Sequence, residues 1–285
     1  MRAALLKNLR SAASRVGRTS MASRPLVAST AMRSFATATA GGNLSVMTKE
    51  NPHVDVVRYE HKNRKWSLGH VDYYSEALAI GFVESGLKPG DAVLCYLPLH
   101  FSETMVLQFA CSKAGFVFYH LDPALAETDP AKSKTALEQA LTLSKANVLV
   151  TQEATDDVNY ISLVEEIIPD IDVFDFASGM PFVCPQFPHL RFPVHTGFDQ
   201  EQKWGFIPLR HMLVPSDNLD EQLKGFELSG STPLLGQFTL GSDGVPTSLG
   251  QTLTNDQVLQ DNAWPTFAAI LKKEFHDVEG VGVVW

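Results

Sequence analysis

The sequence predicts an α/β protein in which parallel strands alternate with helices that cover both faces of the sheet. Three observations support this. Short apolar runs that suit buried strands alternate along residues 66–176 with longer segments of helical periodicity. The turns between them are short and rich in Gly, Pro and Asp. Such an alternation is typical of βαβ units, whose crossovers are almost always right-handed.

The first helix and strand of this pattern lie between residues 71 and 97. Residues 71–85 carry apolar side chains at helical spacing, and Gly86 is the kind of residue that ends a helix in the left-handed conformation. The Lys-Pro-Gly-Asp sequence at 88–91 predicts a turn. Residues 92–97 are apolar throughout, which predicts a buried strand.

The later elements follow by the same criteria. Ser102 can cap a helix that runs to Ala114, and Gly115 ends it. Six proline residues between 181 and 215 predict a loop-rich connection or a set of short strands. The remaining expectations are an extended lead-in at 36–65, strands at 116–120, 147–151 and 171–176, and helices at 136–144 and 160–168.

The first 35 residues have the composition of a mitochondrial presequence. No Asp or Glu precedes Glu50, and three leucines lie at helical spacing among basic residues. A short basic amphipathic helix can be drawn across a membrane whose interior is negative. Residues 33–36, Arg-Ser-Phe-Ala, resemble a matrix-protease signal, which places the expected cut after Phe35. The basic residues of this segment are Arg2, Lys7, Arg10, Arg15, Arg18, Arg24 and Arg33.

The charge reverses after this segment. Residues 50–285 carry 15 basic and 32 acidic side chains, a formal charge of −17. A basic arm that binds nucleic acid is the alternative for residues 1–35, but so acidic a body disfavours binding to nucleic acid or anionic lipid. It suits docking against a basic protein surface. With no apolar run near 18 residues, no transmembrane helix is expected, and the predicted location is the mitochondrial matrix side, peripheral to the inner membrane.

The cysteine and histidine patterns of the sequence do not predict a disulfide framework or a metal site. The three cysteines, Cys95, Cys111 and Cys184, are far apart and odd in number, which disfavours a disulfide framework. The histidines show no H-x-x-x-H or similar ligand spacing, so no metal is expected. The acidic pairs at 156–157 and 165–166 are interpreted as solvated faces.

Residues 66–123 resemble the opening of the adenylate-forming acyl-CoA synthetase (AMP-binding) family. The similarity lies in the order of the pieces rather than in any one of them. The resemblance implies a fold like the N-terminal domain of these enzymes, which we assign to residues 66–285 as a single domain without the carboxy-terminal lid. The matching pieces are Trp66-Ser67, the helix to Gly86, Lys88-Pro89-Gly90-Asp91, Lys113-Ala114-Gly115 and Leu121-Asp122-Pro123.

The family's phosphate-binding loop has a degenerate counterpart at residues 239–248, Thr-Leu-Gly-Ser-Asp-Gly-Val-Pro-Thr-Ser, followed by Leu253-Thr254-Asn255. The family places a Lys where Thr247 stands and a hydroxyl where Asp243 stands. Backbone N–H groups and a cation hold phosphates in such loops, so a carboxylate opposes that role. We therefore expect no catalytic residue and no cofactor. The vestigial loop comprises Thr239, Gly241, Ser242, Asp243, Gly244 and Thr247.

Three functions follow from the resemblance. The first is a non-catalytic accessory subunit of a mitochondrial inner-membrane complex, for which the ATP synthase peripheral stalk is the specific expectation and other subunits of the complex are the partners. The second is an active or split acid–thiol ligase that forms an acyl-adenylate. The third is a sensor module that binds an acyl or CoA group. In the family, the lid and later nucleotide motifs lie beyond the position of Trp285, which favours the first function.

Overall fold

The computed structural model describes residues 39–59, 64–176, 180–198, 203–274 and 278–279. The chain divides into two units, Met1–Arg33 and Ser34–Trp285. The presequence expected at residues 1–35, with its cut after Phe35, lies outside the described residues. All of the described residues belong to the second unit.

A seven-stranded sheet forms the centre of this unit, in the order β7-β6-β5-β3-β4-β8-β9. Every neighbouring pair is parallel except β8 and β9, which form an antiparallel hairpin at one edge. The strands are β3 (Ala92–Tyr96), β4 (Val117–His120), β5 (Val148–Thr151), β6 (Phe192–His195), β7 (Ile207–Pro208), β8 (Pro233–Leu240) and β9 (Pro246–Thr254).

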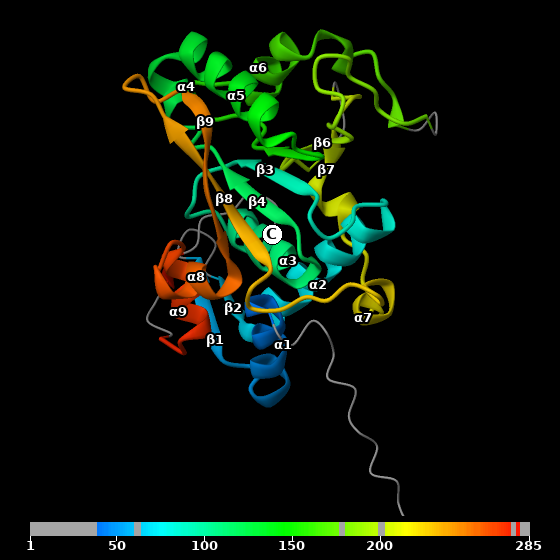
Figure 1. The fold of residues 1–285 in the computed structure, drawn as a ribbon, viewed down its shortest axis with the longest axis vertical. Helices are drawn as coiled ribbons and strands as arrows, with labels where there is room; N and C mark the ends of the chain where they lie inside the picture. The colour runs from blue at the N-terminus through cyan, green and yellow to red at the C-terminus, as the bar shows by residue number, and fades with distance from the viewer. Residues whose placement is uncertain (1–38, 60–63, 177–179, 199–202, 275–277, 280–285) are drawn as a thin grey trace, which may run out of the picture. The chain divides into compact units, whose positions relative to one another are not determined.

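Helices cover both faces of this sheet (Figure 1). Val93 and Cys95 of β3 join the core on the side of α2 (Leu68–Glu84) and α3 (Ser102–Ala114). Leu94 and Tyr96 join a second core on the side of α5 (Pro130–Ser144) and α6 (Tyr160–Ile167). β3 is therefore buried on both of its faces, as its continuous apolar sequence predicts. The α/β class expected from the sequence is therefore confirmed.

Local sequence signals set the ends of these helices. Gly86 follows α2 with φ of +88°, and Gly115 ends α3 with φ of +74°. α5 begins six residues before the predicted start, because Asp129 accepts a hydrogen bond from Lys132 N at 3.0 Å and Pro130 suits the first helical position. The apolar periodicity detects the buried part of this helix, whereas its exposed first turn has none.

The segment expected to be an extended lead-in at 36–65 is folded where the structure describes it. Thr39 caps α1 (Ala40–Glu50), and its hydroxyl accepts a hydrogen bond from Gly42 N at 3.1 Å. β1 (Asp55–Tyr59) and β2 (Arg64–Ser67) then form an antiparallel pair, and β10 (Val278–Glu279) lies parallel to β1. α1 has weak amphipathic character but packs against distant residues, which local sequence cannot reveal.

The strand predicted at 171–176 is absent from the structure. Pro169–Ile171 form a 3₁₀ turn, η3, and Val173 is 79% exposed. Pro169 suits the start of such a turn, and Phe174 and Phe176 pack against the second core instead of joining the sheet. In the described part of the proline-rich region, the elements are β6, β7 and η5 (Leu209–Met212), as expected. The other short helices are α4 (Leu125–Thr128), α7 (Leu219–Gln222), α8 (Asn255–Gln260) and α9 (Pro265–Leu271).

All three cysteines are buried free thiols, as predicted for Cys95 and Cys111. Within the described ranges, no helix has the length and apolarity needed to cross a membrane. Among the same residues, no group of three or more His, Cys, Asp or Glu side chains is arranged to hold a metal ion.

Candidate functional site

The residues of the predicted phosphate loop lie together at the tip of the β8–β9 hairpin (Figure 1). Residues 241–245 connect the two strands, and Thr239 pairs with Ser248 across the hairpin. β8 is anchored in the sheet by β4, whereas residues 247–252 of β9 are exposed on the outer edge. The sequence thus identified a structural unit, and its hydrogen bonds decide what the unit can bind.

The backbone donors of this turn are largely engaged within the turn. Gly241 N donates to Val245 O at 2.8 Å, and Gly244 N donates to Gly241 O at 3.0 Å. Val245 N donates to Asp243 Oδ1 at 3.1 Å. Gly244 has φ of +81°, a conformation that glycine adopts without strain. Three N–H groups that could face a phosphate are therefore occupied in this conformation.

The side chains of the turn offer a phosphate little attraction. The hydroxyl of Thr247, at the position of the family's Lys, donates to Thr239 O at 3.0 Å. Asp243 is exposed, so any anion at the tip meets its carboxylate. Between Lys224 and Lys272 the sequence contains no Lys or Arg, so neither strand of the hairpin supplies a cation.

Thr254 and Asn255, which follow the hairpin, hold the fold together. Thr254 and Gln257 form a capping box at the start of α8. Asn255 is 1% exposed, and its Oδ1 accepts hydrogen bonds from Ser112 Oγ at 2.6 Å and Ala40 N at 3.2 Å. Its amide donates to Thr232 O at 3.0 Å. This residue ties α1, α3 and the start of β8 to α8.

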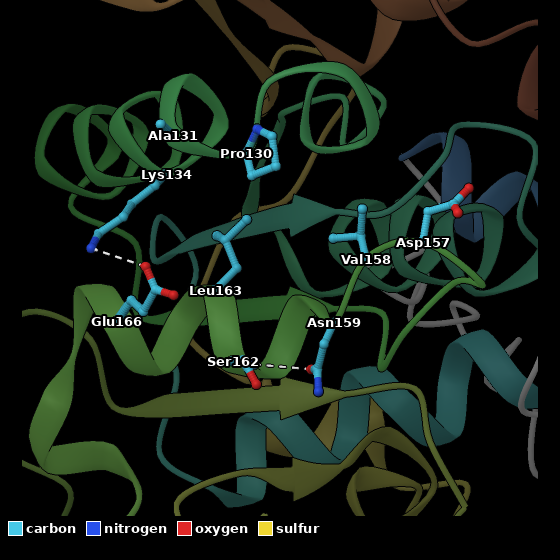
Figure 2. Close-up of a pocket in the computed structure, with 9 residues that line it drawn as sticks. All are labelled: Pro130, Ala131, Lys134, Asp157, Val158, Asn159, Ser162, Leu163 and Glu166. Carbon is cyan, nitrogen blue, oxygen red and sulfur yellow. Dashed lines mark hydrogen bonds and ion pairs between the residues drawn. The ribbon is translucent and has the colours of Figure 1, made fainter.

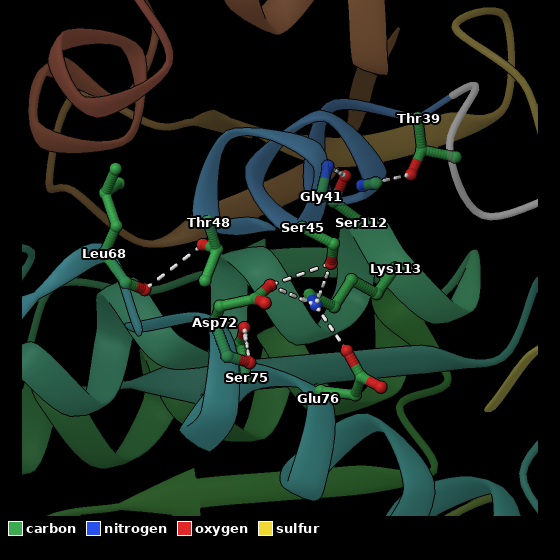
Figure 3. A network of polar contacts seen from close by, with 11 residues as sticks. Thr39, Gly41, Ser45, Thr48, Leu68, Asp72, Ser75, Glu76, Ser112 and Lys113 are labelled. Atoms are coloured by element: carbon green, nitrogen blue, oxygen red, sulfur yellow. Dashed lines mark hydrogen bonds and ion pairs between the residues drawn. The ribbon is translucent and has the colours of Figure 1, made fainter. Parts of the chain in front are cut away.

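Lys113, noted in the sequence only as part of a Lys-Ala-Gly motif, holds α1 against α2 and α3 (Figure 3). Its side chain is 1% exposed, and Nζ lies 2.6 Å from Asp72 Oδ1 and 3.0 Å from Glu76 Oε2. The same ammonium group donates to Ser45 Oγ at 2.6 Å. A lone Lys within an otherwise buried helix was the available signal. Its partners come from other helices, so the sequence alone could not assign them.

The polar residues at the carboxyl end of β4 serve local structure. His120 Nε2 donates to Leu97 O at 2.8 Å, and burial lowers the pKa of this imidazole, which favours its neutral form. Asp122 accepts a hydrogen bond from Ala124 N at 2.9 Å, which forms a turn. Trp264 is buried in the core, Trp204 is exposed, and Trp285 lies outside the described residues.

A cavity of about 450 Å³ lies between the N-terminal halves of α5 and α6 (Figure 2). Asp157 and Glu166, one from each of the two acidic pairs interpreted as solvated faces, both line it. The sequence signal for this site was the absence of any Lys or Arg between Lys145 and Arg191.

Comparison with solved structures identifies proteins of similar fold. Acetoacetyl-CoA synthetase from Streptomyces lividans superposes with a TM-score of 0.60 and 14% identity over 86% of this chain and 38% of that one. The luciferase-like enzyme of the mealworm Zophobas morio superposes with a TM-score of 0.57 and 16% identity over 87% of this chain and 54% of that one. Mycobacterium smegmatis MbtA superposes with a TM-score of 0.55 and 20% identity over 78% of this chain and 34% of that one. The chain thus spans about a third to a half of the length of each of these three structures.

No curated protein matches the chain in sequence. Residues 45–184 match the family model described as AMP-binding enzyme. The match includes α2 to α6 and ends before the β8–β9 hairpin. The mostly parallel seven-stranded sheet is that of the N-terminal domain of adenylate-forming enzymes. Residues 45–184 of this chain therefore resemble an AMP-binding enzyme domain, on a fold that the chain shares with adenylate-forming enzymes.

Proposed function

We propose that this chain uses the adenylate-forming fold without binding ATP at residues 239–247, and that it acts as a non-catalytic accessory protein. One observation carries the proposal: three N–H groups of the turn are bonded within the turn, beside an exposed Asp243 carboxylate. A phosphate at this position would have to replace these hydrogen bonds and also approach a like charge.

The electrostatic penalty can be bounded. Two unit charges 4 Å apart repel by about 1 kcal/mol in water and about 4 kcal/mol at an effective dielectric near 20. Asp243 is exposed, which favours the lower part of this range. The missing Lys removes an attraction of similar size. Together the two changes weaken ATP binding by about one to several orders of magnitude.

We further propose that the protein acts in mitochondria, on the matrix side, where its acidic body docks on other subunits of an inner-membrane complex. The support is the basic, acid-free composition of residues 1–35 and the formal charge of −17 on residues 50–285. The family match and the solved structures concern adenylate-forming enzymes and give no support to an assignment to ATP synthase.

An acid–thiol ligase completed by a further segment or a separate chain is the second candidate. The comparisons favour it over the accessory function, because the matched family consists of AMP-binding enzymes. One matched structure, an anthranilate CoA ligase with a TM-score of 0.53, holds anthranoyl-AMP. The family match ends at residue 184, however, so it does not extend to the turn at 241–245.

Pyrophosphate release separates the two candidates. The full chain, purified with any associated subunits, is incubated with Mg-ATP, CoA and a panel of acetate, benzoate and fatty acids. The accessory function predicts no carboxylate-dependent pyrophosphate above a reaction without protein. Release that depends on both ATP and one of the acids would establish the ligase. Migration on a native gel of mitochondrial extract as a free monomer would refute the accessory role in a complex.

A further inference from the structure

The cavity between α5 and α6 has an apolar centre and charged ends (Figure 2). Pro130, Val158 and Leu163 lie in its middle part. Asp157 lies at one end, and the Lys134–Glu166 ion pair lies at the other, with Nζ and Oε2 3.3 Å apart. A volume of about 450 Å³ is within the range of small binding pockets.

An anion does not suit this cavity. Both helices begin at this cavity, but the side chain of each N-cap residue already accepts a hydrogen bond from the first turn. Lys132 N donates to Asp129 in α5, and Ser162 N donates to Asn159 in α6. Lys134 is the only cation among the lining residues, and Glu166 neutralises it.

The surrounding sequence makes the cavity attractive to cations. Residues 146–190 contain eight acidic side chains and no Lys or Arg, so Asp157 lies in an acidic stretch of the chain, whereas Glu166 is paired with Lys134 from α5. The Asp157 and Glu166 carboxylates lie on opposite sides of the apolar centre, so a ligand that fits has an apolar group between two positive charges, one at Asp157 and one that competes with Lys134 for Glu166.

We propose that this cavity is a docking site for a partner-protein segment that presents leucine-like side chains flanked by Arg or Lys. The apolar side chains pack on Pro130, Val158 and Leu163, and the flanking cations pair with Asp157 and Glu166. The inference goes beyond the proposed accessory function and does not depend on the ATP site. An ATP-binding chain could carry the same docking site, so the two proposals fail separately.

Fluorescence anisotropy with labelled peptides on the full chain tests this site. A nine-residue peptide with Arg-Leu-Leu-Arg at its centre is compared with matched peptides that carry Glu-Leu-Leu-Glu or Arg-Ser-Ser-Arg. We expect saturable binding of the first, at least tenfold weaker binding of the other two, and weakening as salt rises. Equal binding of the Leu and Ser peptides, or no binding of the first, would overturn the proposal.

Three variants locate the binding to the cavity. Asp157→Asn is expected to weaken the Arg-Leu-Leu-Arg peptide about two- to fivefold, as for an exposed ion pair. Lys134→Met removes the competing cation from Glu166 and is expected to strengthen binding by a similar factor. Asp217→Asn, at an exposed acid outside the cavity, should change nothing. A gain cannot result from misfolding, so unchanged or weaker binding to Lys134→Met would contradict the site.

Discussion

Replacing Lys113 with Met is expected to lower the free energy of unfolding by about 3 kcal/mol. The Lys113 ammonium group is buried and donates to Asp72, Glu76 and Ser45, so its removal leaves two carboxylates without their cation. Breaking such a buried pair costs about 3–5 kcal/mol. The side chains of Asp72 and Glu76 are 16% and 29% exposed, so water can partly solvate them, which favours the lower value. Met preserves most of the side-chain volume.

Urea unfolding followed by circular dichroism measures this loss. In a thermal unfolding experiment, the melting temperature should fall by roughly 6–12 °C, since a loss of 1 kcal/mol lowers the melting temperature of a domain of this size by about 2–4 °C. Lys224→Met, at an exposed lysine, is the matched control and should lie within about 0.5 kcal/mol of the wild type. Adding Asp72→Asn and Glu76→Gln to Lys113→Met should recover part of the loss. A Lys113→Met variant as stable as the control would refute the assigned role.

Three further predictions concern the core and its pH dependence. Asn255→Ala should lower the free energy of unfolding by about 2–3 kcal/mol in urea unfolding, because it leaves the buried Ala40 N–H and the Ser112 hydroxyl without their acceptor. Gly41→Ala should lower the free energy of unfolding by about 1–3 kcal/mol, because an added Cβ would lie 2.8 Å from a backbone nitrogen of α3. Gly250→Ala is the control and should not lower it, because a Cβ there meets no atom closer than 3.4 Å. Burial raises the pKa of Cys95 and of Tyr96 to about 12. Both groups are neutral in the folded and unfolded chain below about pH 9, but at higher pH they ionise more readily in the unfolded chain. The free energy of unfolding should therefore fall as the pH rises from 9 towards 12. A free energy of unfolding that stays constant over this range would contradict the prediction.

The elements that the sequence predicted well are those that local chemistry specifies. α3 ends at Ala114 as predicted, because Gly115 follows it in a left-handed conformation, but the prediction that Ser102 caps the helix is wrong: Phe101 is the N-cap residue, and the Ser102 hydroxyl donates to Glu103 instead. β3 and β5 are apolar because both of their faces are buried, and this pattern is visible without any knowledge of their neighbours.

Long-range contacts explain what the sequence did not predict. α1 is held by Lys113 and by Asn255, which lies 215 residues from Ala40, so its sequence alone suggested an extended segment. Residues 171–176 are apolar enough for a strand, but Ile171 ends a 3₁₀ turn, and Phe174 and Phe176 pack against the second core.

For the candidate site too, the sequence predicted the local turn but not the contacts that depend on how strands and helices pack. The residue types of the turn identified a loop at the hairpin tip, because Gly241 and Gly244 favour a turn wherever they occur. The engagement of its N–H groups depends on how the two strands pair, which composition does not determine. The cavity likewise requires α5 and α6 to lie side by side, although the acidic residues that line it were visible in the sequence.

Isothermal titration of the full chain with Mg-ATP tests the proposed function most directly. A variant with Asp243→Thr and Thr247→Lys restores the family's residues to the turn and serves as the comparison. We predict no binding heat for the wild type up to millimolar nucleotide and measurable binding for the variant. Wild-type binding at micromolar nucleotide that is abolished by Gly244→Val would contradict the proposal and establish the hairpin turn as an ATP site.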